Sequence, residues 1–483
     1  MAQGSMTTDK KSKWYHGICG LGPNFAIFNT SPDWVDKSLP AGNTPQRLAS
    51  KIDWGFLLTG KYIIYSINLV WLIMAIGVYL VFPYDYEVSK HWDAAFGEWI
   101  AVRALLNVSL VLMYYGYWHM GLYWFGWSHR PFNPNQAEAY RWSKLIHNIW
   151  YSTLGAIQWT FWEAMMLNCY ATGRMPYVSD QELLDFPMRG MLHVVGWTIA
   201  VPLYREVQFY FAHRLIHIRA LYTYVHSVHH RNTDIEPFSG LCMHPVEHLY
   251  YFTSMAPSLY FCTTPFAFVW NGIHLIIAPG ASHSGYEDHI DSDQHHYLHH
   301  RYFECNYGTT SFPLDSLFGT FRENLSTKSK EYHGNADGVG TKTAATLDRK
   351  ATLLDAPEWD QLIFNLIFCI FSPALLTLAL VNGSQLTRMD CHVLTSMVVL
   401  GPMVGAMLLV LLKSWTKHSS KRHSESMLRR AFYPFHKDGI PSSILHIVLG
   451  VAMGVVPAYH LIHMTLAQPG QGFYSQVLEP SLS

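Results

Sequence analysis

Histidines gather in one part of the sequence. Of the 28 histidines in 483 residues, fourteen lie between positions 213 and 300. Three motifs order them: HRLIH at 213–217, HSVHH at 226–230 and HYLHH at 296–300. Positions i, i+3 and i+4 share one face of a helix, so each motif can direct two or three imidazoles the same way. Eight imidazoles converging from three helices would suit two metal ions that share a substrate or a bridging oxygen.

The type of donor narrows the choice of metal. No cysteine lies within the three motifs, which argues against a thiolate zinc site or an iron–sulfur cluster. Imidazole suits zinc, copper, iron and nickel, and eight ligands exceed the four of a structural zinc site. Spacing alone does not separate iron from zinc. A single histidine is more often a hydrogen-bonded core residue than a ligand, but three ordered motifs within 88 residues favour metal binding.

Composition indicates the elements that must position these side chains. Half of the residues are hydrophobic and 14% are charged, against about 25% charged in typical soluble domains. A membrane-spanning helix needs about 20 apolar residues. We therefore expect an all-α, polytopic integral membrane protein of about six to eight spans. Six segments are long enough to span a membrane: 62–82, 104–128, 249–277, 362–382, 391–412 and 442–468. Two further segments are weaker candidates because they carry charged residues: 145–170 with Glu163, and 191–212 with Arg205 and Glu206.

The same pattern divides the chain into regions. We expect a polar N-terminal segment, N-terminal transmembrane helices, a histidine-bearing catalytic region, a polar linker, C-terminal transmembrane helices and a tail. Their predicted limits are, in that order, 1–57, 58–200, 201–325, 326–360, 361–468 and 469–483.

The distribution of charge predicts which side of the membrane the histidine region faces. The net charge of −1 excludes a global basic field of the kind that binds nucleic acid. Residues 413–438 carry seven Lys or Arg and two acidic residues, so this loop should face the cytoplasm. Two predicted spans separate it from the end of the histidine region, which places the di-metal site on the cytosolic side. The seven scattered cysteines suggest no disulfide framework.

The order HxxxH, HxxHH, HxxHH on a multi-span chain resembles the fatty acid hydroxylase and sterol desaturase superfamily over about residues 190–325. The resemblance implies an integral membrane enzyme, usually of the endoplasmic reticulum, with two non-haem iron ions. It also implies the use of O₂ and of electrons from a redox chain to hydroxylate or desaturate lipids. The metal ligands carried over are His213, His217, His226, His229, His230, His296, His299 and His300.

Smaller elements extend the resemblance. FSGLCMHPVEH at 238–248 resembles an HPxE element that follows the second histidine motif, and HSGYEDH at 283–289 resembles an element of sterol C-4 methyl oxidases. They add His283 and His244 as expected ligands, with an orienting role as the alternative for His244. Weaker candidates are His248 and His289, and we expect His274 and His295 to be bystanders. The run at 299–321 resembles sterol C-5 desaturases instead, so the position of oxidation stays open.

The expected activity is O₂-dependent hydroxylation or desaturation of a lipid C–H bond. A sterol is the first substrate class, oxidised in the manner of a C-5 desaturase or C-4 methyl oxidase. The predicted spans at 361–468 exceed the compact sterol desaturase pattern, which keeps open a fatty acyl or sphingoid hydroxylase or an alkylglycerol monooxygenase-like enzyme. No HPGG element of a cytochrome b5 module occurs, so electrons should come from a separate donor such as cytochrome b5 or a reductase. A histidine-rich transporter or haem carrier would scatter its imidazoles along several spans, and a non-catalytic metal protein remains an alternative.

Overall fold

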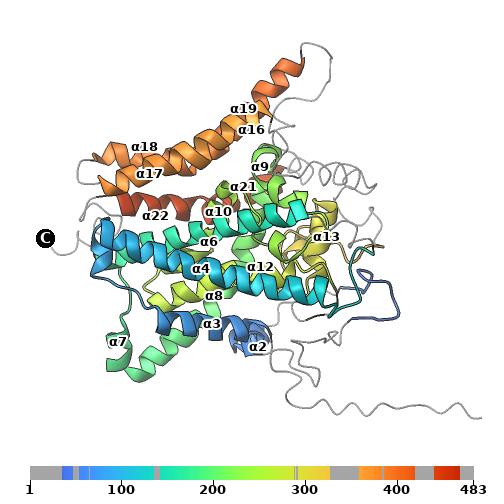
Figure 1. Ribbon diagram of the computed structural model, residues 1–483, viewed down its shortest axis with the longest axis horizontal. Coiled ribbons are helices and arrows are strands. Elements are labelled where there is room, and N and C mark those ends of the chain that lie inside the picture. Colours follow the sequence, from blue (N-terminus) through green and yellow to red (C-terminus); the bar gives the residue numbers. More distant parts are fainter. Residues whose placement is uncertain are drawn as a thin grey trace, which may run out of the picture.

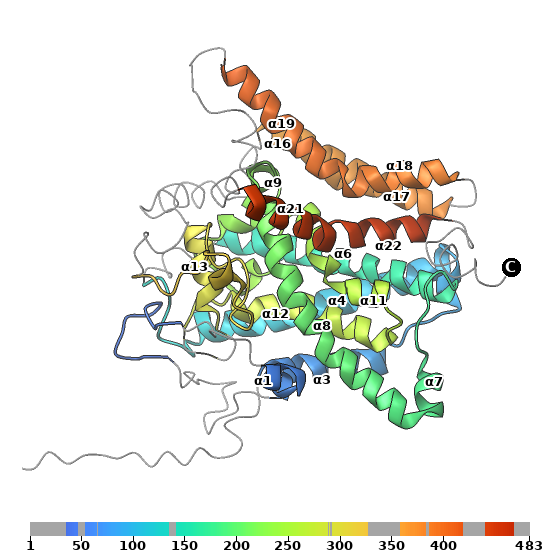
Figure 2. The same ribbon diagram turned by 180° about the vertical axis from the view of Figure 1, so that it is seen from behind.

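The computed structural model describes residues 35–46, 54–64, 66–134, 142–287, 289, 292–326, 358–382, 386–418 and 440–467. Within these ranges every regular element is a helix, as Figures 1 and 2 show, so the predicted all-α class is confirmed for this part of the chain. Most of the predicted linker at 326–360, the tail at 469–483 and most of the basic loop at 413–438 lie outside the described residues.

The N-terminal helices form one wall of the molecule. Two short helices, α1 (Trp54–Leu58) and α2 (Lys61–Ile64), precede α3 (Asn68–Val81). The long helix α4 (Ala94–His119) continues into a π-helical turn, η3 (Met120–Trp124), and lies beside α6 (Trp142–Ala171). A buried ion pair joins them, because Arg103 on α4 approaches Glu163 on α6 to 2.7 Å. The polar residue Glu163 that weakened the prediction of a span thus pairs inside the protein.

The central helices carry the histidines. Two long helices, α8 (Pro187–Ile216) and α12 (Pro265–Ser282), pack against each other. The shorter elements between and after them are α9 (Arg219–Tyr224), η4 (His226–Arg231), η5 (Pro237–Ser239), α10 (Pro245–Tyr251), η6 (Phe252–Met255), α11 (Ala256–Tyr260), α13 (Gln294–Tyr302) and α14 (Leu314–Leu317).

The prediction of one membrane span over 249–277 is wrong. Helix α11 ends before Phe261, and α12 begins at Pro265. The Thr264 side chain caps α12, because its hydroxyl oxygen accepts a hydrogen bond from the Ala267 N–H at 3.1 Å. Proline at the first helical position and threonine as N-cap are strong signals for a new helix. Almost every residue of α12 is buried by other helices. Its apolar character therefore reflects a place in the protein core.

The C-terminal helices form an outer layer, visible at the top of Figures 1 and 2. They are α16 (Trp359–Asn365), the π-helix η8 (Leu366–Phe371), α17 (Ser372–Val381), α18 (Arg388–Val399), α19 (Gly401–His418), α21 (Ile440–Gly454) and α22 (Val456–Leu466). α21 packs on α8. A Cβ atom on Gly450 would lie 2.9 Å from the Phe211 carbonyl oxygen, so glycine permits this close approach at the histidine-bearing end of α8.

Fewer helices satisfy the requirements of a membrane span than the sequence predicts. By length and apolar composition, three helices of the described chain are candidates: Ala94–Trp124, Trp359–Val381 and Pro441–Leu466. The pair Arg388–Val399 and Gly401–Lys413, bent by 53°, is a fourth if it counts as one span. These four coincide with predicted segments, whereas Asn68–Val81 is shorter than a span requires. The number of six to eight spans and the cytosolic orientation remain predictions.

Candidate metal centre

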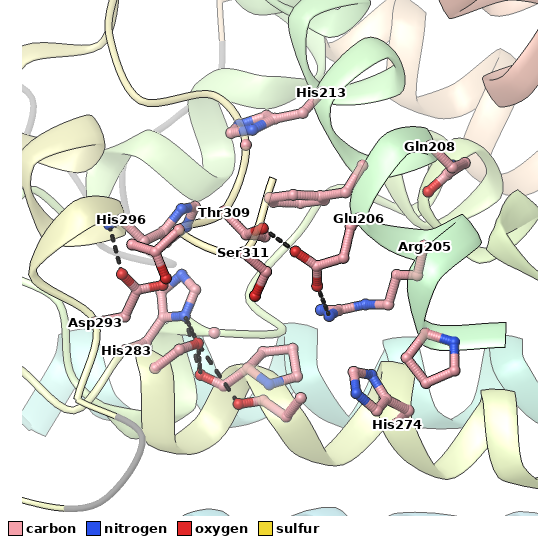
Figure 3. Close-up of a pocket in the computed structure, with 18 of the residues that line it drawn as sticks. Arg205, Glu206, Gln208, His213, His274, His283, Asp293, His296, Thr309 and Ser311 are labelled. Atoms are coloured by element: carbon pink, nitrogen blue, oxygen red, sulfur yellow. Dashed lines mark hydrogen bonds and ion pairs between the residues drawn. The ribbon is translucent and has the colours of Figure 1, made fainter. Parts of the chain in front are cut away.

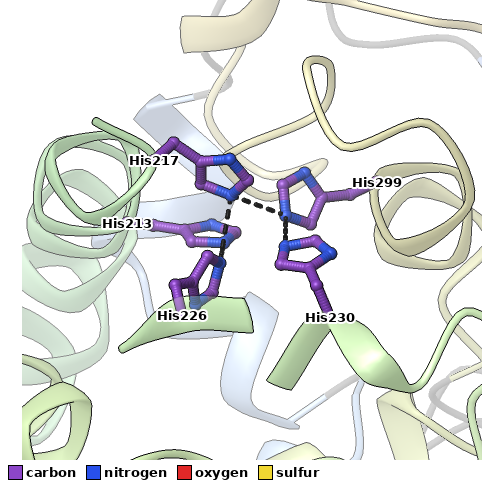
Figure 4. Close-up of side chains that lie close together, drawn as sticks. All are labelled: His213, His217, His226, His230 and His299. Carbon is purple, nitrogen blue, oxygen red and sulfur yellow. Dashed lines mark hydrogen bonds between the residues drawn. The ribbon is translucent and has the colours of Figure 1, made fainter. Parts of the chain in front are cut away.

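Nine buried histidines form two adjacent groups. The first histidine cluster comprises His213, His217, His226, His230 and His299, shown in Figure 4. The second histidine cluster comprises His229, His283, His296 and His300. Within each cluster the ligand nitrogens all lie within 4.8 Å of one another. The two clusters touch, because the rings of His230 and His300 have centroids 4.8 Å apart.

Each predicted motif contributes in a regular way. Residues four apart enter the same cluster, as do His213 with His217, His226 with His230 and His296 with His300. The middle histidine of each HxxHH motif, His229 or His299, enters the other cluster. Each motif therefore directs two imidazoles into one cluster, within the predicted two or three. The second motif also forms a 3₁₀ helix instead of an α-helix.

The nitrogen spacings of the first cluster suit ligands of one ion. The Nε2 atom of His226 lies 3.2 Å from that of His213 and 3.0 Å from that of His217. The Nε2 atom of His299 lies 3.3 Å from that of His217 and 3.0 Å from that of His230. Two imidazoles bound at about 2.1 Å to one ion, at angles of 90–109°, have nitrogens about 3.0–3.4 Å apart.

Hydrogen bonds at the other ring nitrogen fix which nitrogen can bind a metal. His213 Nδ1 donates to the Tyr307 carbonyl at 2.8 Å, and His299 Nδ1 donates to the Cys305 carbonyl at 2.7 Å. A carbonyl only accepts, so both protons sit on Nδ1 and both Nε2 atoms carry lone pairs. Lone pairs packed together in a buried site need a cation between them. The donor set therefore fits a metal ion in the first cluster.

The second cluster shows the same design. His283 Nδ1 donates to the Pro279 carbonyl at 2.9 Å, and His229 Nδ1 donates to the Cys242 carbonyl at 3.3 Å. His283 Nε2 is buried without a hydrogen-bond partner, and a ligand position would satisfy it. The Nε2 atoms of His296 and His300 lie 3.2 Å apart. These donors also fit a metal ion.

Burial keeps the imidazoles neutral. It lowers the pKa of His226, His230 and His299 well below the ordinary value, and the neighbouring histidines lower each pKa further because two imidazolium ions would repel. Burial likewise lowers the pKa of His300 well below that value. Neutral imidazole is the form that binds a metal, so the site presents its ligands ready for use.

The residues that follow the third motif form a turn with a role in the site. α13 ends at Tyr302, and Phe303 and Asn306 adopt positive φ angles of 67° and 53°. Asn306 tolerates this conformation better than most residues. The turn directs the Cys305 and Tyr307 carbonyls to the Nδ1 atoms of His299 and His213. The segment thus ends the helix and also orients two imidazoles.

Asp315 fixes this turn. Its carboxylate accepts hydrogen bonds from the Tyr307 and Gly308 N–H groups, both at 2.8 Å, and from the Thr320 hydroxyl at 2.6 Å. It also lies 3.2 Å from His295 Nε2. Although burial opposes ionisation, the hydrogen bonds from His295 and Thr320 hold the pKa of Asp315 below its usual value. Asp315 thus supports the turn beside the clusters.

His244 is the one predicted ligand outside both clusters. Its Nδ1 accepts a hydrogen bond from the Val246 N–H at 3.2 Å and caps α10, and its Nε2 lies 2.9 Å from Asn365 Oδ1. Both ring nitrogens are thereby engaged away from the clusters, so the predicted ligand role of His244 is not supported. The histidines His248, His289 and His295 also lie outside both clusters. The Arg322 side chain contacts the Asn324 and Leu325 carbonyls and the Tyr302 ring, and the Arg322 backbone forms two hydrogen bonds with the Asn306 side chain of the turn.

A cavity of about 750 Å³ leads to the clusters. It runs between α8 and α12, and its lining includes His213, His229, His283 and His296. Figure 3 shows His283 and His296 on one side of the cavity and Arg205 and His274 on the other side. A substrate in this cavity would therefore contact the metal ligands at one end only.

Two residues of the site had no predicted role. Glu247 accepts from His226 Nδ1 at 2.8 Å and therefore orients a ligand. Its place in the HPVEH element was visible in the sequence, but the partner of the carboxylate was not. His274, expected to be a bystander, lines the cavity. One histidine in a long apolar run gives no sign that it faces a cavity.

Comparison with known proteins assigns the domain. The sequence model of the fatty acid hydroxylase family matches residues 198–320. A Delta(7)-sterol 5(6)-desaturase of Gibberella zeae is 32% identical over 144 residues, which cover 26% of this chain and 44% of that protein. A lathosterol oxidase of Rattus norvegicus is 22% identical over 290 residues, covering 57% of this chain and 93% of that protein.

A very-long-chain aldehyde decarbonylase of Oryza sativa subsp. japonica is 30% identical over 167 residues, covering 30% of this chain and 61% of that protein. The match thus spans less than half of the fungal desaturase and most of the rat oxidase. No solved structure matches. These matches identify residues 198–320 as a fatty acid hydroxylase domain, and with the sterol desaturase relatives they indicate an oxygen-dependent oxidoreductase.

Proposed function

We propose that the protein oxidises a C–H bond of a membrane lipid with O₂ at a di-iron centre held by the two histidine clusters. The observation that carries this proposal is the convergence of nine buried imidazoles, several of which line the cavity. Five residues would hold one ion and four the other, so the nine ligands together exceed the four of a single structural zinc site.

Iron is the metal we propose, because O₂ chemistry requires a redox-active ion. Zinc satisfies an imidazole site but has no redox chemistry. When bound, the iron pair supplies the activation of O₂ that opens an unreactive lipid C–H bond to oxidation. The residues of the chain have the remaining tasks. The Tyr307 and Cys305 carbonyls orient two ligands, and the packed helices exclude water from the cavity end.

A sterol is the first substrate class that we propose, on the strength of the sterol named in the desaturase and oxidase relatives. Oxidation at C-5 or at a C-4 methyl group follows from the sequence elements at 299–321 and 283–289. A long-chain lipid is the second candidate, supported by the decarbonylase relative. We also propose an endoplasmic reticulum membrane location and a separate protein as electron donor.

Metal analysis and product analysis test this function together. The full-length protein, purified in detergent, should contain about two iron ions per chain, and the variant His299→Ala should lose iron. Cells that lack the gene should accumulate one lipid that only the wild-type gene clears. Full rescue of the lipid profile by His299→Ala would refute catalysis at the clusters. A stoichiometric zinc content with no redox-active metal would refute the proposed chemistry.

A further inference from the structure

The end of the cavity remote from the histidine clusters carries polar side chains. His274 on α12 and Arg205 on α8 lie there together, as Figure 3 shows, and both line the cavity. One turn further from the clusters, Trp270 Nε1 donates to the Thr198 carbonyl at 3.1 Å and joins the two helices. An apolar lipid terminus would leave polar groups unmatched at this end. The lining therefore suits a polar group of the ligand.

Two indole rings and one amide hold His274 in place. The Trp71 ring meets its imidazole edge-on at a centroid distance of 4.9 Å, and the Trp270 ring does so at 5.4 Å. His274 Nε2 lies 2.8 Å from Asn68 Oδ1. The orientation of Asn68 follows from its amide nitrogen, which faces the Tyr62 carbonyl at 3.5 Å. His274 Nε2 therefore carries the proton and donates to Asn68.

The other ring nitrogen of His274 lacks a partner. Nδ1 is buried without a hydrogen bond, and the side chain is 3% exposed. Since Nε2 carries the proton, Nδ1 carries a lone pair and can only accept. A buried acceptor without a hydrogen bond is unfavourable, so such atoms in native proteins usually bind a water molecule or a ligand. The group that satisfies Nδ1 must be a donor, and a hydroxyl group is the donor that lipids commonly carry.

We propose that His274 Nδ1 accepts a hydrogen bond from the hydroxyl group of a lipid alcohol whose other end lies at the histidine clusters. This inference rests on the proposed lipid oxidation and narrows its substrate. The hydroxyl oxygen can in turn accept from the neighbouring Arg205 guanidinium. An ionised carboxylate has no proton to donate to Nδ1 and would meet Glu206, which lies beside Arg205 at 3.9 Å. The site thus selects an alcohol over a fatty acid anion.

The position of His274 sets the position of oxidation. His274 and the ligand His283 are nine residues apart on one helix, which corresponds to about 13 Å along the axis. The oxidised carbon would therefore lie far from the hydroxyl group. A sterol bound this way presents its side chain to the clusters, because C-4 and C-5 lie close to C-3, the carbon that bears the hydroxyl. A long-chain alcohol presents a carbon deep in its chain.

Binding measurements on the full-length protein in detergent test this inference without turnover. The probes are a tritiated 3-hydroxysterol and a tritiated long-chain alcohol, each paired with its methyl ether. At least one alcohol should bind about 10-fold more tightly than its ether, because the ether cannot donate to Nδ1. The alcohol that does so identifies the source of the hydroxyl group. Equal binding of alcohol and ether in both pairs, or no binding of either alcohol, overturns the inference.

Two substitutions separate ligand binding from support of the fold. His274→Gln keeps an amide N–H near the Nε2 position and can still donate to Asn68, but it has no acceptor at the Nδ1 position. His274→Asn places an amide oxygen near the Nδ1 position and loses the bond to Asn68. The preference for the alcohol should vanish in His274→Gln and persist in His274→Asn. The reverse result would mean that His274 only supports Asn68.

Product analysis distinguishes the inference from the proposed function. A product oxidised remote from its hydroxyl group agrees with the inference and with the oxidation of a lipid C–H bond, and it excludes oxidation at C-5 or at a C-4 methyl group. A product oxidised beside the hydroxyl group, such as a C-5 desaturated sterol, overturns the binding register while it leaves the proposed function intact. Selective binding of the alcohol in wild type, with no product and no redox-active metal, refutes the proposed function while the hydroxyl site stands.

Discussion

Replacement of Asp315 by asparagine should loosen the metal centre from a distance. One carboxylate oxygen faces the Tyr307 N–H and the Thr320 hydroxyl, and the other faces the Gly308 N–H and His295. An amide nitrogen at either position meets two donors and accepts from neither. Two hydrogen bonds to a charged group are lost, and each is worth about 1.5–3 kcal/mol. The expected destabilisation is about 3–6 kcal/mol, before relaxation of the turn.

The turn that Asp315 fixes also orients His213 and His299 through the Tyr307 and Cys305 carbonyls. Loss of such an orienting contact typically costs 10- to 100-fold in metal affinity. Metal content should be measured after dialysis against graded chelator, together with the thermal midpoint in detergent. Thr320→Val is the matched control, because it removes one bond to the carboxylate and spares both backbone bonds. Wild-type metal affinity and thermal midpoint in Asp315→Asn would refute the reasoning.

Three further predictions concern the clusters. Glu247→Ala should weaken metal binding about 10- to 100-fold, and Glu247→Gln should weaken it less, since an amide oxygen can still accept from His226 Nδ1; equal chelator titrations of the two variants would contradict this. His283→Ala should lower metal content, whereas His244→Ala should leave it unchanged and cost about 1 kcal/mol for the lost cap of α10; elemental analysis and thermal melts of both variants decide. In the metal-free protein the pKa of His226, His230 and His299 lies well below the ordinary 6.5, so as pH falls below 6.5 the unfolded chain binds protons that the folded chain does not. Each such histidine should then lower stability by about 1.4 kcal/mol per pH unit, and melting of chelator-treated protein that does not change between pH 7 and pH 5 would refute this.

Much of the site could be predicted from the sequence because local spacing determines it. Residues four apart face one way on a helical turn, so the pairs within each motif enter one cluster together. The division of HSVHH and HYLHH between two clusters could not be predicted, because it depends on how η4 and α13 approach each other. The exclusion of His244 depends on Asn365, which lies more than a hundred residues away in sequence. Contacts of that separation leave no periodic signal.

The membrane spans were predicted less well than the site, because hydropathy alone does not separate a membrane span from a core helix. Hydropathy measures how apolar a segment is, and a core helix of a large protein is as apolar as a membrane span. Residues 249–277 illustrate this, since α12 is covered by other helices and begins only at Pro265. The cap at Thr264 and the proline that follows it were the local signals that contradicted a single span. A long apolar run therefore predicts burial more securely than it predicts insertion.

The two helices that frame the cavity would link the proposed metal site to the proposed position of the lipid. Both α8 and α12 run toward the clusters, with His213 and His283 at their C-terminal ends and with Arg205 and His274 about two turns or more before them. A helix is stiff along its axis because its backbone hydrogen bonds repeat along the chain, and between His274 and His283 only Pro279 lacks an N–H group to donate. The bond from Trp270 to the Thr198 carbonyl joins the two helices beyond the polar end, and the clusters join them at the other. The distance between the polar end and the metal ligands is therefore a property of regular helix and not of a loop. A substitution that shortens or lengthens a side chain at position 274 should change which ligand binds, but it should not move the metal site.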